Sequence, residues 1–443
     1  MSPEPTTVCI VTFGCQMNRL DSQVLRGELA RAGFALTDEP DRADAVLYNT
    51  CSVRRHAEDK VFSHLGALRR RAEADPRFVL GVIGCMAQRL GDEIVKRFPF
   101  VSLACGTGAL LRVPGHLSRV REGDRPVVDL DLGEPLRFER SCSMRQSGHG
   151  AYVSVMRGCD NFCAYCVVPY VRGREVSRPP ADVLAEVERL AADGVREVTL
   201  LGQNVNSYGK GLDEPADLAD LLALVNGVDG LERIRFLTSH PKDMSDRILD
   251  AVAGCKGVCE HLHVPAQSGS DAVLARMNRG YTAADYREMV ERARARITGA
   301  ELASDFIVGF PGETDADFEQ TLRLLREVRF QQSFMFKYSP REETRAARWP
   351  DDVPDDVKRE RHRILLEAQQ EVDAERRASM VGRTVEVLVD GVSRKDPGKL
   401  SGRTRGNDIV AFPAPPGLAG ELCGVRIVGS TPLTLFGERV RNG

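Results

Sequence analysis

From residue 151 to about residue 339 the sequence repeats one pattern six times: an apolar stretch typical of a strand, then a stretch with helical spacing of apolar residues. The expected strands are AYVSVMRG, REVTLLGQN, RIRFLTSH, HLHVPAQ, LASDFIVGF and QSFMFKYS. Strands joined by helices pair in parallel with right-handed crossovers, and the sheet curls toward a barrel with the helices outside. Six units predict a partial (β/α)6 barrel rather than the full form of eight units.

The segments on either side of this repeat follow other patterns. Before it, apolar runs such as VCIVTFG and ADAVLYNT alternate with helical stretches up to about Leu117, which predicts a small α/β domain with a parallel sheet. After about Ser379, short β-like pieces are separated by glycine and other turn residues, which predicts a small antiparallel β-barrel. We therefore expect an α/β protein with three domains, at residues 6–121, 145–375 and 378–441.

Composition and charge exclude several classes of protein. The 443-residue chain has a formal charge of −3, so contact with nucleic acid would come from local basic patches rather than from a basic surface overall. No apolar run approaches the ~20 residues of a membrane helix, and the first residues lack the pattern of a signal peptide. We expect a cytoplasmic protein without membrane association. Because that compartment keeps thiols reduced, the 12 cysteines favour metal or redox chemistry over disulfides.

Three cysteines, here named the loop triad, lie just after the first expected barrel strand. Cys159, Cys163 and Cys166 are spaced C-x3-C-x2-C, with no nearby fourth ligand that would complete a zinc site. Thiolates suit iron–sulfur clusters, and a four-iron cluster on three cysteines leaves one iron open to an outside ligand. Barrel active sites lie at the carboxyl ends of the strands, as this loop does. We interpret the triad as a [4Fe–4S] site for radical chemistry with S-adenosylmethionine; three packed structural cysteines are the alternative.

Three other cysteines, here named the sheet triad, are far apart in the sequence. Cys15 lies in FGCQMN, Cys51 in YNTCSVR and Cys85 in IGCMAQR, each at the end of an expected strand of the N-terminal domain. In an open parallel sheet these ends face one crevice, so distant residues can converge there. A second cluster with an open iron is the functional interpretation, and structural cysteines are again the alternative.

Together with LLGQNVNSYG, VPAQSGSDAVLARMNRGYT, SDFIVGFPGET and FMFKYSPR, these motifs resemble the methylthiotransferases, a family of radical S-adenosylmethionine enzymes, over essentially the full chain. The resemblance implies an N-terminal methylthiotransferase domain, a radical core and a C-terminal TRAM domain. GCQMN, NTCSVR and GCMAQR are similar to the tRNA-modifying branch. Gln16 and Met17 carry the distinction from the branch that modifies a ribosomal protein.

The resemblance also implies a reaction. The substrate would be N6-isopentenyl(dimethylallyl)adenosine next to the anticodon of a tRNA, which receives sulfur at C2 and then a methyl group from S-adenosylmethionine. The loop triad would be catalytic and hold the cluster that cleaves S-adenosylmethionine, and the sheet triad would hold the cluster that delivers sulfur. The implied cofactors are two [4Fe–4S] clusters and S-adenosylmethionine. An electron donor and a sulfur donor are needed in addition, and we expect a monomer.

Polar residues at the mouth of the barrel are candidates for binding the nucleoside cofactor. Gln203 and Asn204 follow the second strand, and Gln267 and Ser268 follow the fourth, where their side chains can contact a ligand or satisfy local backbone. Several arginines surround the loop triad and could bind RNA phosphate or the methionine carboxylate, or could simply be solvated. These arginines are Arg157, Arg172, Arg174 and Arg178.

The resemblance adds two further groups of residues. Tyr165, Ile307 and Gly309 match family segments that contact the cofactor. The basic, glycine-rich stretch SRKDPGKLSGRTRGNDIVAF suggests RNA binding through backbone contacts, with a purely structural role as the alternative. The residues of this stretch that match the family pattern are Arg403, Thr404 and Asn407.

Three other functions compete with this interpretation. A methylthiotransferase could act on another tRNA adenosine, or on a ribosomal protein, which Gln16 and Met17 disfavour. A non-enzymatic iron–sulfur protein could bind RNA as a sensor. The sensor hypothesis leaves the open-iron spacing, the barrel and the cofactor-like segments without a purpose.

Overall fold

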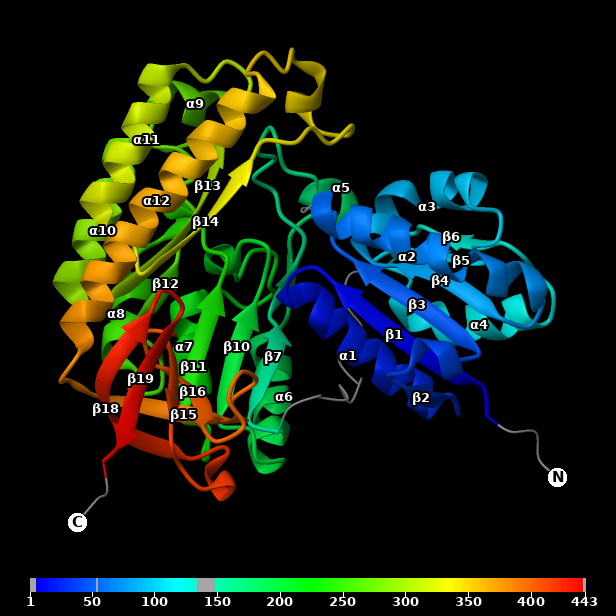
Figure 1. Ribbon diagram of the computed structural model, residues 1–443, viewed down its shortest axis with the longest axis horizontal. Helices are drawn as coiled ribbons and strands as arrows, with labels where there is room; N and C mark the ends of the chain where they lie inside the picture. The colour runs from blue at the N-terminus through cyan, green and yellow to red at the C-terminus, as the bar shows by residue number, and fades with distance from the viewer. Residues whose placement is uncertain (1–4, 53–54, 134–147, 441–443) are drawn as a thin grey trace. The chain divides into compact units, whose positions relative to one another are not determined.

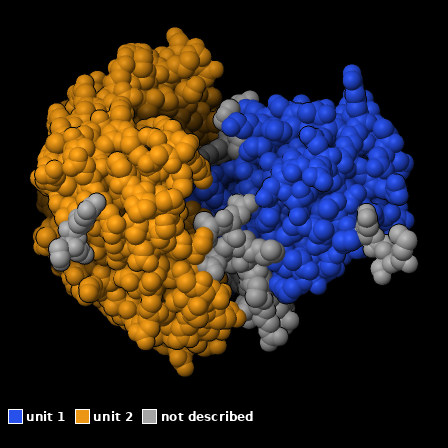
Figure 2. All heavy atoms as spheres, turned by 60° about the horizontal axis from the view of Figure 1, so that its bottom comes forward, with its two compact units in different colours: residues 1–146, 156–162, 166–176 blue, residues 147–155, 163–165, 177–443 orange. Residues whose placement is uncertain are grey.

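The computed structural model describes residues 5–52, 55–133 and 148–440 (Figure 1). The chain forms two compact units, which Figure 2 distinguishes by colour. Unit 1 comprises residues 1–146, 156–162 and 166–176, and unit 2 comprises residues 147–155, 163–165 and 177–443. Part of the predicted connector between the first two domains, residues 134–147, lies outside the described residues. Within the described ranges, no helix is both long enough and apolar enough to cross a membrane.

Unit 1 is built on a parallel sheet with the strand order β2-β1-β3-β4-β5-β6. The three strands expected from the sequence are present, and three short strands of three residues each join them, too short to show a period. The strands are β1 (Thr7–Phe13), β2 (Ala35–Thr37), β3 (Ala45–Thr50), β4 (Val79–Ile83), β5 (Leu103–Cys105) and β6 (Val127–Asp129). The order changes direction at β1, which lies between β2 and β3.

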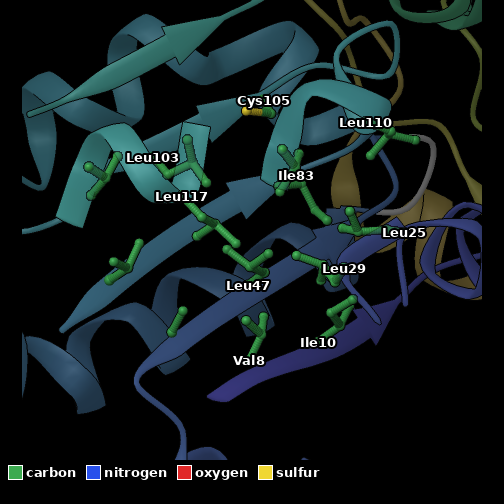
Figure 3. Close-up of a cluster of buried hydrophobic side chains, with 14 of the residues drawn as sticks. Val8, Ile10, Leu25, Leu29, Leu47, Ile83, Leu103, Cys105, Leu110 and Leu117 are labelled. Atoms are coloured by element: carbon green, nitrogen blue, oxygen red, sulfur yellow. The ribbon is translucent and has the colours of Figure 1, made fainter. Parts of the chain in front are cut away.

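Helices cover both faces of this sheet. Leu25 and Leu29 of α1 (Gln16–Arg31) and Leu117 of α4 (Val113–Arg121) pack on the face that carries Val8 and Leu47 (Figure 3). Side chains of α2 (Arg55–Ala74) and α3 (Cys85–Arg97) pack on the other face, which carries the alternate strand residues. Short 3-10 turns lie at η1 (Pro40–Arg42) and η2 (Leu110–Arg112). The segment after the barrel's first strand adds β8 (Met156–Arg157), α5 (Val168–Arg172) and β9 (Val176–Ser177).

The main part of unit 2 contains the six expected strand–helix units. The strands form two parallel sheets, β11-β10-β7 and β12-β13-β14, and a parallel bridge between Ile234 and Val258 lies beside them. The strands are β7 (Gly150–Ser154), β10 (Glu197–Leu201), β11 (Arg233–Leu237), β12 (His261–His263), β13 (Glu301–Val308) and β14 (Gln332–Lys337). Each of them is followed by at least one helix before the next of these six strands begins.

The helices of this part are α6 (Pro180–Ala192), α7 (Leu218–Asn226), α8 (Asp246–Gly254), α9 (Asp271–Arg276), α10 (Ala283–Arg296), α11 (Asp315–Val328) and α12 (Asp355–Met380). Short 3-10 turns are η3 (Val205–Ser207), η4 (Pro241–Asp243) and η5 (Arg345–Arg348). Capping boxes set where α10 and α11 begin: Thr282 and Thr314 each accept a hydrogen bond from the backbone of an aspartate three residues later. Helices α10, α11 and α12 lie side by side over β12–β14 (Figure 1).

The C-terminal part of unit 2 is a closed five-stranded barrel, which confirms the small barrel expected from the sequence. Its strands are β15 (Thr384–Val392), β16 (Leu400–Thr404), β17 (Ile409–Phe412), β18 (Leu422–Thr431) and β19 (Thr434–Arg439), with a 3-10 turn at η6 (Pro416–Leu418). Four strand pairs are antiparallel, but β17 and β19 are parallel, which differs from a purely antiparallel barrel. Directions cannot alternate around a ring with an odd number of strands, so one parallel pair is required.

Candidate functional site

The sheet triad converges at the carboxyl edge of the sheet in unit 1. Cys15 caps α1 directly after β1, Cys51 follows β3, and Cys85 begins α3 after β4. A hydrogen bond with the Cys51 side chain lowers the pKa of Cys15 to about 6, and the charge of Cys15 acts in turn on Cys85. Open α/β sheets bind ligands where the strand order changes direction, and β1 lies at that point. The structure therefore brings three distant thiols together.

Two glycines make room for this convergence. Gly14 and Gly84 precede Cys15 and Cys85 and have φ angles of +138° and +84°. A Cβ atom on Gly14 would lie 2.6 Å from the Cβ of Cys51, and one on Gly84 would overlap the side-chain oxygen of Asn49. Positive φ and the close approach both favour glycine.

A buried asparagine pair fixes the strand ends that carry the triad. Asn18 Nδ2 donates to Asn49 Oδ1 at 3.1 Å, and Asn49 Nδ2 donates to the Asn18 carbonyl at 2.9 Å. The Cys15 thiol donates to Asn18 Oδ1 at 3.3 Å. Because both amides are buried and bonded to each other, they hold the first turn of α1 and the end of β3 in one relative position.

A buried ion pair lies beside the sheet triad. Arg172 Nη2 donates to Asp21 Oδ2 at 2.6 Å, and the two side chains are 5% and 1% exposed. Burial raises the pKa of Cys85, and the charge of Arg172 together with a hydrogen bond to its side chain opposes this effect. Asp21 therefore balances the charge of an arginine that the sequence had suggested for RNA or cofactor binding.

The other arginines near the loop triad also have partners within the protein. Arg157 is buried in unit 1 and donates to Thr107 Oγ1 at 2.9 Å. Arg178 is buried in unit 2 and pairs with Glu186 at 2.7 Å. Only Arg174 among the four is on the surface, where its pairing with Asp160 leaves its side chain 74% exposed. Of these arginines it is the one that remains open to a phosphate.

Residues 156–162 and 166–176, which contain Cys159 and Cys166, belong to unit 1. Gly158, with a φ of +78°, is followed by Cys159, whose N–H donates to the Gly173 carbonyl at 3.3 Å. A Cβ atom on Gly158 would overlap the Arg174 carbonyl. Val167 and Val171 of the same segment pack against Cys85.

The middle of the cysteine loop belongs to unit 2. The Ala164 N–H donates to the Met277 carbonyl at 2.8 Å, and the Ala164 carbonyl accepts from the Ala346 N–H at 2.8 Å. Tyr165 packs edge-on against Phe310, with ring centroids 6.4 Å apart. Tyr165 and Ile307, two predicted cofactor residues, lie in this one apolar cluster.

Gln267 and Ile307 are adjacent at the mouth of the barrel. Gln267 has a φ of +67°, its N–H donates to the Asp305 carbonyl at 2.8 Å, and its carbonyl accepts from the Ile307 N–H at 2.9 Å. Gly309 has a φ of +68°, and a Cβ there would overlap the Lys358 side chain. The backbone of these two segments thus has a fixed, uncommon shape at the carboxyl end of β13.

Two of the other predicted cofactor residues form hydrogen bonds within the protein. The Asn204 side-chain amide is buried and donates to Asp243 Oδ2 at 2.7 Å. The Ser268 hydroxyl is within 3.2 Å of Thr321 Oγ1 on α11. Gln203 lies half-buried in the loop after β10. The side chains of Asn204 and Ser268 are therefore turned to internal partners.

The predicted RNA residues form the turn between β16 and β17. Arg403 Nη1 donates to Asn407 Oδ1 at 3.0 Å, and Thr404 Oγ1 accepts from the Asp408 N–H at 3.0 Å. The carbonyls of Arg403 and Thr404 accept hydrogen bonds at 2.6 and 2.7 Å from two arginines of β11. These arginines are Arg233 and Arg235. The turn therefore connects the small barrel to the strands of the larger one.

The sequence analysis missed one buried residue at the loop triad. Arg279 Nη1 donates to Cys163 Sγ at 3.4 Å. Its segment, MNRGYT, carried a turn signal at Gly280 but nothing that connects it with a cysteine 116 residues earlier. Sequence periodicity does not report such a contact.

The donor chemistry of both triads fits iron–sulfur clusters. All six cysteines are free thiols. In the described part of the chain, no three His, Cys, Asp or Glu side chains are arranged for a single metal ion. A single zinc ion draws its ligands to about 2.0–2.3 Å, whereas in a four-iron cluster each cysteine binds its own iron, so the thiols stand farther apart.

Comparisons with known proteins show the family of the chain. Residues 153–325 match the model of the Radical SAM superfamily, residues 7–106 match Uncharacterized protein family UPF0004, and residues 378–440 match the TRAM domain. A protein of Clostridium botulinum (strain Hall) named tRNA-2-methylthio-N(6)-dimethylallyladenosine synthase is 44% identical over 433 residues, which cover 97% of this chain and 96% of that protein. The chain belongs to this synthase family. It is therefore a radical S-adenosylmethionine enzyme of the methylthiotransferase type.

Relatives of the same name occur in other bacteria. The protein of Clostridium beijerinckii is 45% identical, with 99% of this chain and 96% of that protein covered. The protein of Chromobacterium violaceum is 48% identical, with 97% and 98% covered. The similarity thus extends across both triads and the C-terminal barrel.

Solved structures share the fold at low sequence identity. The radical S-adenosylmethionine methyltransferase TsrM from Kitasatospora setae matches with a TM-score of 0.57 at 17% identity, over 78% of this chain and 77% of that one. The radical enzyme OxsB matches with a TM-score of 0.53 at 13% identity, over 84% of this chain and 56% of that one. These similarities concern the fold alone.

Proposed function

We propose that this enzyme is a tRNA-2-methylthio-N6-dimethylallyladenosine synthase that inserts sulfur at C2 of N6-isopentenyladenosine next to the anticodon and methylates it, in the cytoplasm. The observation that carries the proposal is the presence of both triads in one chain that is similar over its whole length to enzymes of that name. The proposed domains are residues 6–121, 145–375 and 378–441. Electron and sulfur donors are further partners.

The two triads would hold two [4Fe–4S] clusters. When bound, the clusters supply one-electron cleavage of S-adenosylmethionine at the loop triad and sulfur at the sheet triad. The C–H bond at C2 of adenine has no acidic character, and positioned acids and bases contribute only ~10²–10⁴-fold, so a radical is needed. The protein's part is to hold the ligands, exclude water and orient the substrate.

In the sheet triad, the residues of the chain fix the thiols before any ligand binds. The Asn18–Asn49 pair and the two glycines hold the strand ends. The buried Arg172 places positive charge near thiols that must be deprotonated to bind iron.

In the barrel, backbone groups near the loop triad are suited to a nucleoside. We propose that Tyr165, Ile307 and the backbone at Gln267 and Gly309 contact S-adenosylmethionine. Tyr165 and Ile307 share one apolar cluster, and Gln267 and Gly309 have positive φ angles, which supports the proposal. The Gln203 side chain would be a polar contact to S-adenosylmethionine. The side chains of Asn204 and Ser268 would act only by shaping the same loops.

The predicted RNA contacts remain part of the proposal. Arg403, Thr404 and Asn407 would present their turn, rather than free side chains, to the RNA, since their polar groups already have internal partners. Arg174 adds an exposed positive charge in unit 1. Phosphate contacts of this kind give affinity without reading sequence.

The decisive experiment is mass spectrometry of tRNA nucleosides from a strain that lacks the protein. We expect the methylthio-isopentenyl nucleoside to disappear while its unthiolated precursor accumulates, and the wild-type gene to restore it. A gene that encodes Cys51→Ala should not restore it. An unchanged tRNA profile would overturn the substrate assignment, and ribosomal proteins would then be analysed for a missing methylthio mass.

A further inference from the structure

Arg279 is a buried arginine in the turn after α9. It is 6% exposed, and its guanidinium donates four hydrogen bonds. Nη2 donates to the Pro265 carbonyl at 2.9 Å, and Nε donates to the Tyr281 hydroxyl at 3.1 Å. Nη1 donates to Cys163 Sγ at 3.4 Å and to the Tyr165 hydroxyl at 3.5 Å.

The charge of Arg279 is not balanced by a carboxylate. Among the described residues, no Asp or Glu forms an ion pair with Arg279, and its hydrogen bonds go to Tyr281, Cys163, Tyr165 and the Pro265 carbonyl. Other buried arginines do have such partners: Arg172 pairs with Asp21, and Arg361 pairs with Glu313 at 2.7 Å. Arginine stays charged in proteins, and a buried charge without a counter-charge is costly.

Of the groups that accept hydrogen bonds from Arg279, the Cys163 sulfur is the one that would coordinate iron. Burial raises the pKa of Tyr281, which keeps that phenol neutral. The Pro265 carbonyl cannot ionise. A cysteine that coordinates metal, by contrast, is deprotonated outright. The Cys163 sulfur is therefore the group that can balance the guanidinium once iron is bound.

We propose that Arg279 is a positioning residue that supplies the counter-charge to the Cys163 thiolate and thereby raises the reduction potential of the cluster on the loop triad. The inference rests on the proposed assignment of a [4Fe–4S] cluster to Cys159, Cys163 and Cys166. Reduction adds one electron from a low-potential donor and makes no new bond, so the cluster and its thiolates gain one negative charge. A fixed positive charge and an N–H donor at a ligand sulfur stabilise the more negative state.

The same residue connects the cysteine loop with the mouth of the barrel. The Tyr281 hydroxyl that accepts from Arg279 donates to the Ala266 carbonyl at 2.7 Å, and Arg279 itself binds the neighbouring Pro265 carbonyl. The segment that follows, Gln267, pairs with β13 through two backbone hydrogen bonds. Arg279 therefore fixes Cys163 relative to the segment proposed to contact the cofactor.

The test is a redox titration of the full-length, iron-reconstituted protein, with sodium dithionite as the reductant and electron paramagnetic resonance as the readout. The signal that changes on addition of S-adenosylmethionine identifies the loop cluster. Arg279→Gln removes the charge, and Arg279→Lys keeps it without the guanidinium fork. Arg276→Gln is the matched control, since Arg276 is exposed at the end of α9 and loses the same charge.

We expect the ratio of reduced to oxidised loop cluster at a fixed potential to fall about tenfold in Arg279→Gln, which corresponds to about 59 mV. The reduction potential of Arg279→Lys should be nearer to that of the wild type, and the potential of Arg276→Gln should equal that of the wild type. If Arg279→Gln loses iron while Arg279→Lys keeps both its iron and the wild-type reduction potential, the result still supports a role for the positive charge at residue 279. Wild-type potentials in an iron-loaded Arg279→Gln, or equal iron loss in both variants, would overturn the inference. A wild-type protein without a signal that responds to S-adenosylmethionine would instead overturn the cluster assignment itself.

Discussion

Cys15, Cys51 and Cys85 come from three strand ends of one parallel sheet, whereas Cys159, Cys163 and Cys166 lie within residues 159–166 of one loop. The sheet triad depends on tertiary structure: positive-φ glycines, a buried asparagine pair and an ion pair hold it. The loop triad is set mostly by its own spacing. Each triad has a buried arginine, but Asp21 balances Arg172 while Arg279 has no described carboxylate partner. One site thus depends on the fold, and the other on local sequence.

The largest expected effect separates the two triads chemically. Cys163→Ala should lower cleavage of S-adenosylmethionine to 5′-deoxyadenosine by at least about 10³-fold, because it removes one of the three proposed ligands of the cluster that supplies the electron. Cys51→Ala should keep the cleavage but abolish the methylthio product. Both products are measured by liquid chromatography of single-turnover reactions, with Cys255→Ala as a control outside both triads. Equal loss of cleavage in the two variants would contradict the assignment of cleavage to the loop triad alone.

The second prediction concerns the ion pair of the sheet triad. Arg172→Met or Asp21→Leu alone should destabilise the protein by about 3–5 kcal/mol, because each leaves one buried charge without a partner. The double variant should cost less than either single change. Urea unfolding of all three variants checks this as a double-mutant cycle. Additive effects would show that the charges do not interact.

The third prediction tests the glycines. Gly84→Ala should destabilise by about 1–3 kcal/mol and reduce bound iron, since the new methyl group overlaps the Asn49 side chain. Gly66→Ala is the matched control: it lies in α2 with no atom near its Cβ position, and it should stabilise the helix by about 0.5–1 kcal/mol. Iron content and unfolding midpoint are measured on both. Normal iron binding in Gly84→Ala would mean that the sheet triad tolerates a shift of its strand ends.

The smallest predicted effect is a pH dependence located in unit 2. Burial lowers the pKa of His261 to about 3, and neither ring nitrogen has a hydrogen-bond partner among the described residues. Below the ordinary histidine pKa of about 6.5, the unfolded chain takes up a proton that the folded chain does not. The free energy of unfolding therefore decreases as the pH is lowered, by about 1.4 kcal/mol at about pH 5.5. His261→Leu should remove this part of the dependence. Urea midpoints at roughly pH 7.5 and 5.5 measure it, and an unchanged slope in the variant would contradict the assignment.

Sequence patterns predicted the elements with strong periodicity and the loop triad, whose spacing is local. The short strands β2, β5 and β6 were missed because three residues cannot show a period. The parallel pairing of β17 with β19 follows from the number of strands in the ring, which no single strand reveals. Arg279 and Asp21 were missed because each contact joins segments more than 100 residues apart.

The arginines of β11 have a consequence for how this chain can change over evolution. Arg233 and Arg235 bind the carbonyls of three successive residues in the β16–β17 turn, Arg403, Thr404 and Arg405. Every amino acid carries that carbonyl, so the side chains outside those bonds can vary without releasing the turn. These three hydrogen bonds to the small barrel therefore do not depend on which side chains the turn carries. Lineages can therefore alter the side chains of the turn while the small barrel stays attached to β11.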